Sequence, residues 1–197
     1  MRSSRTWCAK TAERRTLRGL VAALVALAAV SARADWTAFA PDGARFAVEL
    51  PGAPAVERDA HWTPVGSVRM TKYWLRAGDT LLAVELHEIP SVASALISDQ
   101  RILDQARDSL LSDVGGTLLS GRELEFQGAP ARDFVYRLPG RAQLAERVLA
   151  VLVDSRLYLV TGMARAPDED PRVVRFFGSF RCWPEMGSDA APAPARR

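Results

Sequence analysis

The sequence predicts an α+β domain built mainly from an antiparallel sheet. Apolar and polar residues alternate with a period of two over much of the chain, which is typical of strands with one buried face. Two segments change to a helical period. The connections between strands are too short for the crossovers that parallel neighbours require. Hairpins, a helix, further hairpins and a last helix therefore indicate an antiparallel sheet packed with two principal helices.

The alternation in the first half of the chain predicts five strands. The first two are short, at 36–40 and 45–50, and three longer ones follow, at 55–62, 67–77 and 80–89. The second strand ends at Pro51, because proline cannot donate to a strand pairing. In the fifth strand Leu82, Val84 and Leu86 share the apolar face, so His87 and Glu85 should lie together on the opposite face.

Two amphipathic helices are predicted. Residues 99–114 place an apolar stripe on one side, made of Ile102, Leu103, Ala106, Leu110, Leu111 and Val114. Ser98 is the expected N-cap of this helix, and Gly115 ends it. The second helix should begin after Asp170 as N-cap, with Pro171 in the first helical position. Its expected apolar stripe is Val173, Val174, Phe177 and Phe180.

Between the helices the alternation resumes. Four strands are expected at roughly 117–127, 131–138, 143–153 and 156–163. The segment Gly128–Pro130 is expected to separate the first of these strands from the second. We find no internal repeat and no linker, so residues 35–183 form one predicted domain, and 184–197 form a predicted disordered tail.

The basic character of the chain is concentrated in residues 1–34. This segment holds seven basic residues and one acidic residue, whereas the other 163 residues hold 19 basic and 22 acidic ones, a net charge of −3. A basic region, the apolar stretch 19–30 and a small-residue site before Asp35 are typical of a secretory signal peptide. We expect cleavage between Ala34 and Asp35 and a periplasmic location. An uncleaved anchor is the alternative, and Arg14-Arg15 leaves the twin-arginine route open beside the general secretory route.

Short motifs in the predicted domain resemble a known family. The segments are Phe46–Pro54, Gly128–Phe134, Arg156–Tyr158 and Arg175–Phe180. They resemble segments of small exported bacterial proteins in the PsbP-like family, named after an extrinsic subunit of photosystem II, which includes DcrB-type envelope proteins. The resemblance spans nearly all of 36–181. It implies an antiparallel sheet with packed helices, and it implies no catalytic activity because the group shares no active-site motif.

Candidate chemical sites are weak in this sequence. His87 and Glu85 could bind a metal ion or exchange a proton, but two ligands make a poor site, and His61 is 26 residues away. Ser179 lacks the frame of a catalytic serine, and packing or a backbone hydrogen bond explains it better. Cys182, the one cysteine beyond the leader, is expected to be a partly buried small residue. The acids 168–170 suit a helix N-terminus better than a calcium site. We therefore expect no catalytic, metal or cofactor residues.

Aromatic residues offer a possible ligand or partner surface. Trp36, Trp62, Tyr73 and Trp74 gather in the first third of the predicted domain. Filling the space between sheet and helix is the more ordinary role of such residues. Binding of nucleic acid would need a basic face with interleaved aromatic residues, and a mature chain with a net charge of −3 gives no support for one. The sequence thus predicts an exported non-enzymatic protein that binds an unknown envelope protein or component. The alternative is a binder of a small apolar ligand or lipid in a cleft between sheet and helix.

Overall fold

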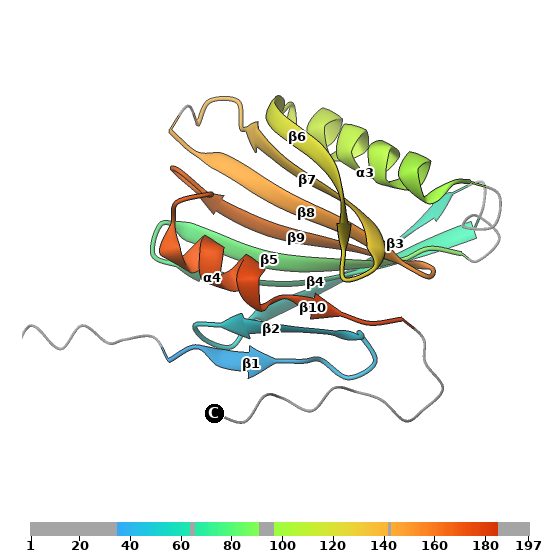
Figure 1. Ribbon diagram of the computed structural model, residues 1–197, viewed down its shortest axis with the longest axis horizontal. Coiled ribbons are helices and arrows are strands. Elements are labelled where there is room, and N and C mark those ends of the chain that lie inside the picture. Colours follow the sequence, from blue (N-terminus) through green and yellow to red (C-terminus); the bar gives the residue numbers. More distant parts are fainter. Residues whose placement is uncertain (1–34, 64–65, 91–96, 142, 185–197) are drawn as a thin grey trace, which may run out of the picture. The chain divides into compact units, whose positions relative to one another are not determined.

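Two antiparallel sheets and two helices make up the part of the chain that the structure describes (Figure 1). The computed structural model describes residues 35–63, 66–90, 97–141 and 143–184, and these described residues belong to one compact unit. The predicted leader 1–34 and the predicted tail from residue 185 onward lie outside the described residues. No helix within the described ranges is both long and apolar enough to cross a membrane.

The larger sheet has seven strands in the order β3-β4-β5-β9-β8-β7-β6. Their bounds are β3 Ala55–Thr63, β4 Gly66–Ala77, β5 Thr80–Glu88, β6 Thr117–Phe126, β7 Ala129–Arg137, β8 Ala145–Val153 and β9 Arg156–Ala164. Every neighbouring pair is antiparallel, because short turns join the strands within each half. The two halves meet where β9 pairs with β5. The predicted α+β class is confirmed.

A smaller sheet of three strands lies beside one face of the larger one. It consists of β1 Thr37–Phe39, β2 Phe46–Leu50 and the two-residue β10 Arg181–Cys182. The sequence did not predict β10, because two residues after a helix show no periodicity. Pairing of β10 with Ala47 and Phe46 joins the C-terminal end of the domain to its second strand.

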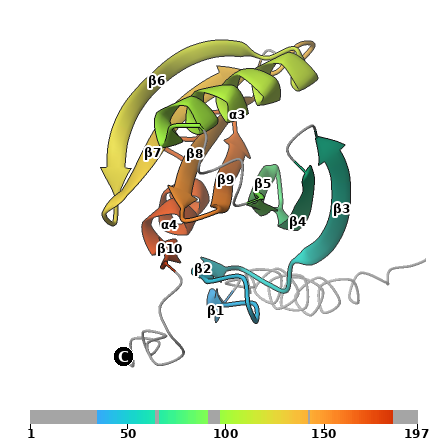
Figure 2. The same cartoon turned by 90° about the vertical axis from the view of Figure 1, so that its right-hand side faces the viewer.

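The two faces of the larger sheet bury different elements (Figure 2). We call them the α3 face and the α4 face. Helix α3, Asp99–Val114, covers β7 and β8 on the first face over a core that includes Leu103, Phe134 and Val148. Helix α4, Pro171–Ser179, and the small sheet cover the second face. Strand alternation separates the cores, because neighbouring residues point to opposite faces.

Helix α3 has the predicted bounds and the predicted apolar stripe. Ile102 and Leu103 are buried, and the remaining stripe residues pack against the same core. Gly115 ends the helix with φ 61°, a left-handed conformation that glycine adopts readily. Ser98 occupies the N-cap position, but its side chain makes no capping hydrogen bond.

Helix α4 begins as predicted and buries a partly different stripe. Asp170 accepts hydrogen bonds from the backbone N–H groups of Arg172 and Val173, as an N-cap does. The helix buries Val173, Phe176 and Phe177, and Phe180 is buried just beyond its end as the C-cap, whereas Val174 is 48% exposed. The prediction for Val174 was wrong because positions i, i+3 and i+4 share one side of a helix, and Val174 stands outside that set.

The turn before β7 lies earlier than predicted. Gln127 and Gly128 have φ values of 54° and 84°, so they form the two-residue turn themselves. Ala129 and Pro130 belong to β7, where the sequence predicted a break. Pro130 is tolerated because it pairs with Glu125 alone, while pairing with β8 begins at Ala131.

Candidate functional site

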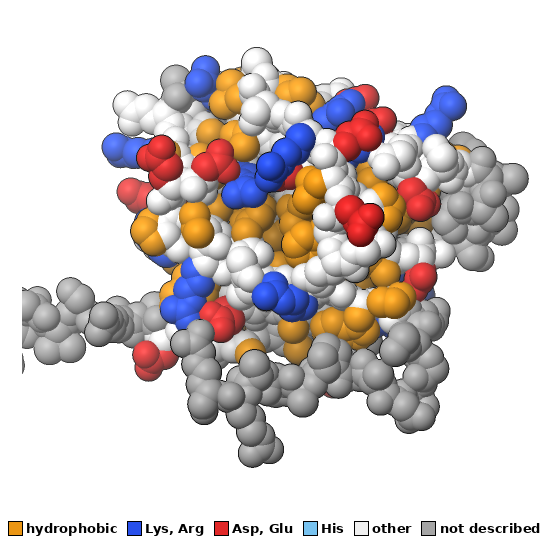
Figure 3. All heavy atoms as spheres, in the orientation of Figure 1, with side chains coloured by type: hydrophobic (Ala, Val, Ile, Leu, Met, Phe, Trp, Pro, Cys, Tyr) orange, Lys and Arg blue, Asp and Glu red, His pale blue; other side chains and the backbone are white. Residues whose placement is uncertain are grey.

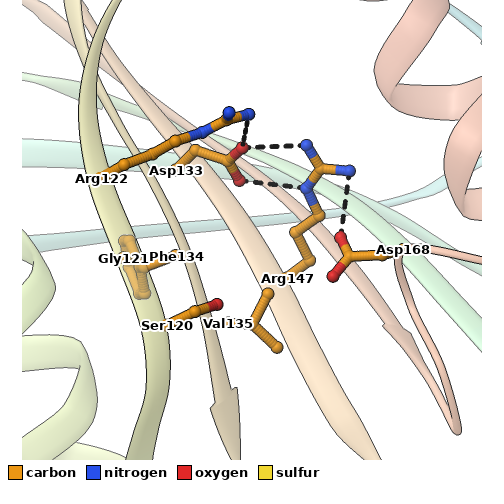
Figure 4. Close-up of a pocket in the computed structure, with 8 residues that line it drawn as sticks. All are labelled: Ser120, Gly121, Arg122, Asp133, Phe134, Val135, Arg147 and Asp168. Carbon is orange, nitrogen blue, oxygen red and sulfur yellow. Dashed lines mark hydrogen bonds and ion pairs between the residues drawn. The ribbon is translucent and has the colours of Figure 1, made fainter.

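An open pocket of about 380 Å³ lies on the α4 face (Figure 4). Strand β6 contributes Ser120, Gly121 and Arg122, β7 contributes Asp133, Phe134 and Val135, β8 contributes Arg147, and the loop before α4 contributes Asp168. We call these eight residues the charged groove. Figure 3 shows this side of the molecule, where charged side chains border an area of apolar atoms.

Four charged side chains form a chain of ion pairs along the groove. Arg147 donates to Asp133 twice, from Nε to Oδ1 at 3.0 Å and from Nη2 to Oδ2 at 2.9 Å. Arg122 Nη2 also donates to Asp133 Oδ2 at 2.9 Å. Arg147 Nη1 lies 3.2 Å from Asp168 Oδ1. Positive and negative groups therefore alternate from Arg122 to Asp168.

The exposure of these side chains falls toward the middle of the chain of ion pairs. Asp133 is 9% exposed and Arg147 is 21% exposed, whereas Arg122 and Asp168 are 68% and 60% exposed. A buried charge is tolerated only when it is paired and hydrogen-bonded. The inner pair is therefore part of the fold, and the two outer groups remain accessible to solvent.

Strand register and helix packing position the inner pair. Arg122 stands directly opposite Asp133 across β6 and β7. The guanidinium of Arg147 lies 4.8 Å from the ring centroid of Phe177 on α4, a cation–π contact. Gly162, the β9 neighbour of Arg147, permits this approach of α4. A Cβ atom at Gly162 would lie only 2.6 Å from Val173 Cγ1.

The arginines also control the charge of Asp133. Burial alone would raise the pKa of this carboxyl, but hydrogen bonds from Arg147 and Arg122, together with their charges, outweigh it. The pKa of Asp133 consequently lies below its ordinary value. The carboxylate stays ionised near neutral pH and is a poor proton acceptor there.

A second pocket of about 270 Å³ lies at the N-terminus of α4. Of its acids, Asp170 accepts the helix N–H groups and the Thr80 hydroxyl, the latter at 3.0 Å, and pairs with Arg172. Asp170 therefore caps the helix, and Asp168 pairs with Arg147. Among the described residues, no three His, Cys, Asp or Glu side chains are grouped as metal ligands would be.

His87 and Glu85 lie together on the α3 face, as the alternation predicts. Glu85 Oε1 lies 2.6 Å from Lys72 Nζ, and Glu85 Oε2 lies 3.5 Å from His87 Nε2. The His87 Nε2 atom is buried without a hydrogen-bond partner in the described structure. The side chain of His61 lies outside the described residues. Its backbone is in β3, two strands from β5, and it pairs with Val68, two residues from the Met70 that pairs with His87, so the two backbones lie about 12 Å apart.

The structure divides the aromatic residues between different surroundings. Tyr73 contacts Phe39 and Phe46 edge-on in the core of the α4 face, and Trp36 packs against the same core. Trp74 follows Tyr73 in β4, lies on the other face and donates to Glu57 at 2.8 Å. The side chain of Trp62 lies outside the described residues. A common ligand or partner surface for these residues stays a prediction, as does cleavage between Ala34 and Asp35.

Two isolated residues have structural roles that agree with the sequence interpretation. The Ser179 hydroxyl donates to the Phe176 carbonyl at 2.8 Å and accepts from the Glu49 N–H at 2.9 Å. Cys182 is buried, and burial raises the pKa of its thiol to about 12. The Cys182 thiol therefore stays protonated near neutral pH, and a thiol is a much weaker nucleophile than a thiolate.

The sequence interpretation did not bring the four members of the chain of ion pairs together. Asp133 lies in the motif Gly128–Phe134 and Asp168 among the acids 168–170, but neither was predicted to join Arg122 and Arg147, and the four are spread over 47 positions. One signal was present: Asp133 and Arg147 occupy inward positions of predicted strands whose other inward positions, such as Ala131 and Leu149, are apolar. A charged residue at such a position usually needs a charged partner.

Comparison with known proteins identifies the fold. No protein-family model matches the chain, and no curated protein matches it. Among solved structures, the chain is similar to the solution structure of cyanobacterial PsbP (CyanoP) from Synechocystis sp. PCC 6803. The TM-score is 0.53 at 13% sequence identity, and the match covers 76% of this chain and 94% of that one. The chain therefore has a PsbP-like α+β fold. The specific likeness to DcrB-type proteins stays a prediction.

Proposed function

We propose that this chain is an exported, non-enzymatic protein that binds another component of the cell envelope through the charged groove. The observation that carries this proposal is the geometry of the groove. Its inner charges are fixed by one another, while Arg122 and Asp168 face solvent at its two ends. Groups that are already held in place lose little conformational freedom on binding, which favours recognition.

The ionisation of the groove supports a binding role over a catalytic one. A general base works best when its pKa lies near the working pH. The pKa of Asp133 is instead lowered, which takes it further from neutral pH, and both of its oxygens accept hydrogen bonds from arginines. Asp133 therefore suits a fixed electrostatic element. The fold of the CyanoP structure is compatible with a binding protein of this kind.

The proposal that the protein is exported rests on residues 1–34, whose composition is typical of a signal peptide. N-terminal sequencing of the protein recovered from cells tests this part. An N-terminus at Asp35 is expected. Recovery of Met1 would contradict cleavage and support the uncleaved anchor.

A small ligand in the same groove is the second candidate, because about 380 Å³ falls in the range of small-molecule pockets. The four charged side chains favour a polar ligand over a lipid chain, which would have to desolvate them without compensation. Native mass spectrometry of the protein from cells separates the two candidates. A retained protein would support the partner, and a retained small molecule would support the ligand. An empty protein at cellular concentrations would contradict both.

A further inference from the structure

The two ends of the charged groove have opposite charge and unused hydrogen-bonding capacity. Within the described structure Arg122 uses one N–H for Asp133, and a guanidinium has five. Among the described residues Asp168 forms one ion pair, to Arg147, and its carboxylate can accept several more hydrogen bonds. Both side chains are more than half exposed. An occupant can therefore reach both groups without disturbing the inner Asp133–Arg147 pair.

The distance between the ends suits a short peptide. The path from Arg122 to Asp168 runs through Asp133 and Arg147. It consists of two contacts of 2.9 Å, one contact of 3.2 Å and the width of one guanidinium group. This path sets an upper limit of about 11 Å on the distance between the ends, which a peptide of at most three extended residues would span. Ser120 and Val135 line the pocket with them, so a hydroxyl and an apolar surface are available to the backbone and side chains of an occupant.

We propose that the charged groove binds a polypeptide segment of at most about three residues that presents a carboxylate to Arg122 and a cationic nitrogen to Asp168. This inference rests on the proposed function and specifies the chemistry of what is bound. The two charges can come from the free termini of a short peptide. They can also come from acidic and basic side chains within a longer protein. Both sources share the same zwitterionic chemistry, and the test separates them.

The test titrates three peptides into the protein recovered from cells, followed by two-dimensional NMR of the backbone amides. Trialanine with free termini represents the first source, and N-acetyl-Glu-Ala-Lys-amide represents the second. N-acetyl-trialanine-amide is the neutral control. We expect at least one zwitterionic peptide to shift the signals of Gly121 and Asp168 saturably, and the neutral peptide to leave them in place. The peptide that binds identifies the source.

Charge-neutralising variants complete the test. Arg122→Gln and Asp168→Asn should each weaken peptide binding at least threefold, because each removes one of the two recognised charges. Arg101→Gln is the matched control, since Arg101 is exposed on α3 at the opposite face. Each variant removes one mostly exposed charge, and unfolding midpoints check that the fold persists.

Two outcomes overturn the inference: neither zwitterionic peptide saturates, or the neutral peptide binds equally well. Native mass spectrometry distinguishes this failure from failure of the proposed function. If the peptides fail while a co-purified protein is lost on Arg122→Gln, the groove still binds a partner and only the zwitterionic chemistry is wrong. If the wild-type protein retains neither partner nor ligand, the proposed function itself fails.

Discussion

The strongest stability prediction concerns Asp133, the buried carboxylate that joins two arginines. Asp133→Asn keeps the shape of the side chain but removes its charge, so Arg147 and Arg122 lose their shared acceptor. Removing one partner of a buried ion pair typically costs about 3–5 kcal/mol. Arg122 is mostly exposed and Arg147 retains Asp168, so we expect the lower end, about 3 kcal/mol.

The effect of this substitution should depend on pH in a definite direction. The folded protein holds the pKa of Asp133 below its ordinary value, so the carboxylate stabilises the fold at pH values above that ordinary value. This stabilisation is lost as the pH falls through the lowered pKa. The difference in unfolding free energy between wild type and Asp133→Asn should therefore shrink in acid.

Urea unfolding monitored by circular dichroism at neutral pH and in acid measures both effects. Asp168→Asn is the matched control, because the same chemical change at a 60% exposed site should cost less than about 1 kcal/mol. A cost below about 1 kcal/mol for Asp133→Asn at neutral pH, or a cost that does not change with pH, would refute the reasoning.

Three further predictions concern the packing around α4. Gly162→Ala should destabilise the fold by about 1–3 kcal/mol, because its Cβ would lie 2.6 Å from Val173 Cγ1; an unchanged thermal midpoint would contradict this. Asp170→Ala should cost about 1–2 kcal/mol in urea unfolding through loss of the helix cap, and a neutral result would show that the cap is dispensable. Cys182, with a thiol pKa near 12, should react with iodoacetamide at pH 8 only when the protein unfolds; rapid labelling of the folded protein would show that the thiol is accessible.

The elements of the fold could largely be predicted from sequence because their signals are local. The helix at 99–114 has a complete apolar stripe and a glycine at its end, and its bounds agree with the structure. Asp170 and Pro171 mark the start of α4 for the same reason. One error arose at Pro130, because a proline usually indicates a break between strands. Pro130 nevertheless belongs to β7, at a part of that strand that β8 does not pair with.

The candidate site could not be predicted because its members meet only through long-range pairing. Arg122, Asp133 and Arg147 come together because β6, β7 and β8 are neighbours, and Asp168 joins them through the loop that follows β9. The spacing of these residues in the sequence does not predict that arrangement. The histidine–glutamate pair was accessible to sequence reasoning, since Glu85 and His87 are two residues apart in one strand.

The central claim, that the charged groove contacts a partner in the cell, is tested most directly by site-specific cross-linking. A photoreactive amino acid placed at Ser120 in the groove is compared with one at Arg101 on the opposite face, in intact cells. We predict a discrete cross-linked product from Ser120 that is absent from Arg101 and is reduced when Arg122→Gln is combined with the Ser120 probe. Equal products from both positions, or a Ser120 product that Arg122→Gln leaves unchanged, would contradict the claim.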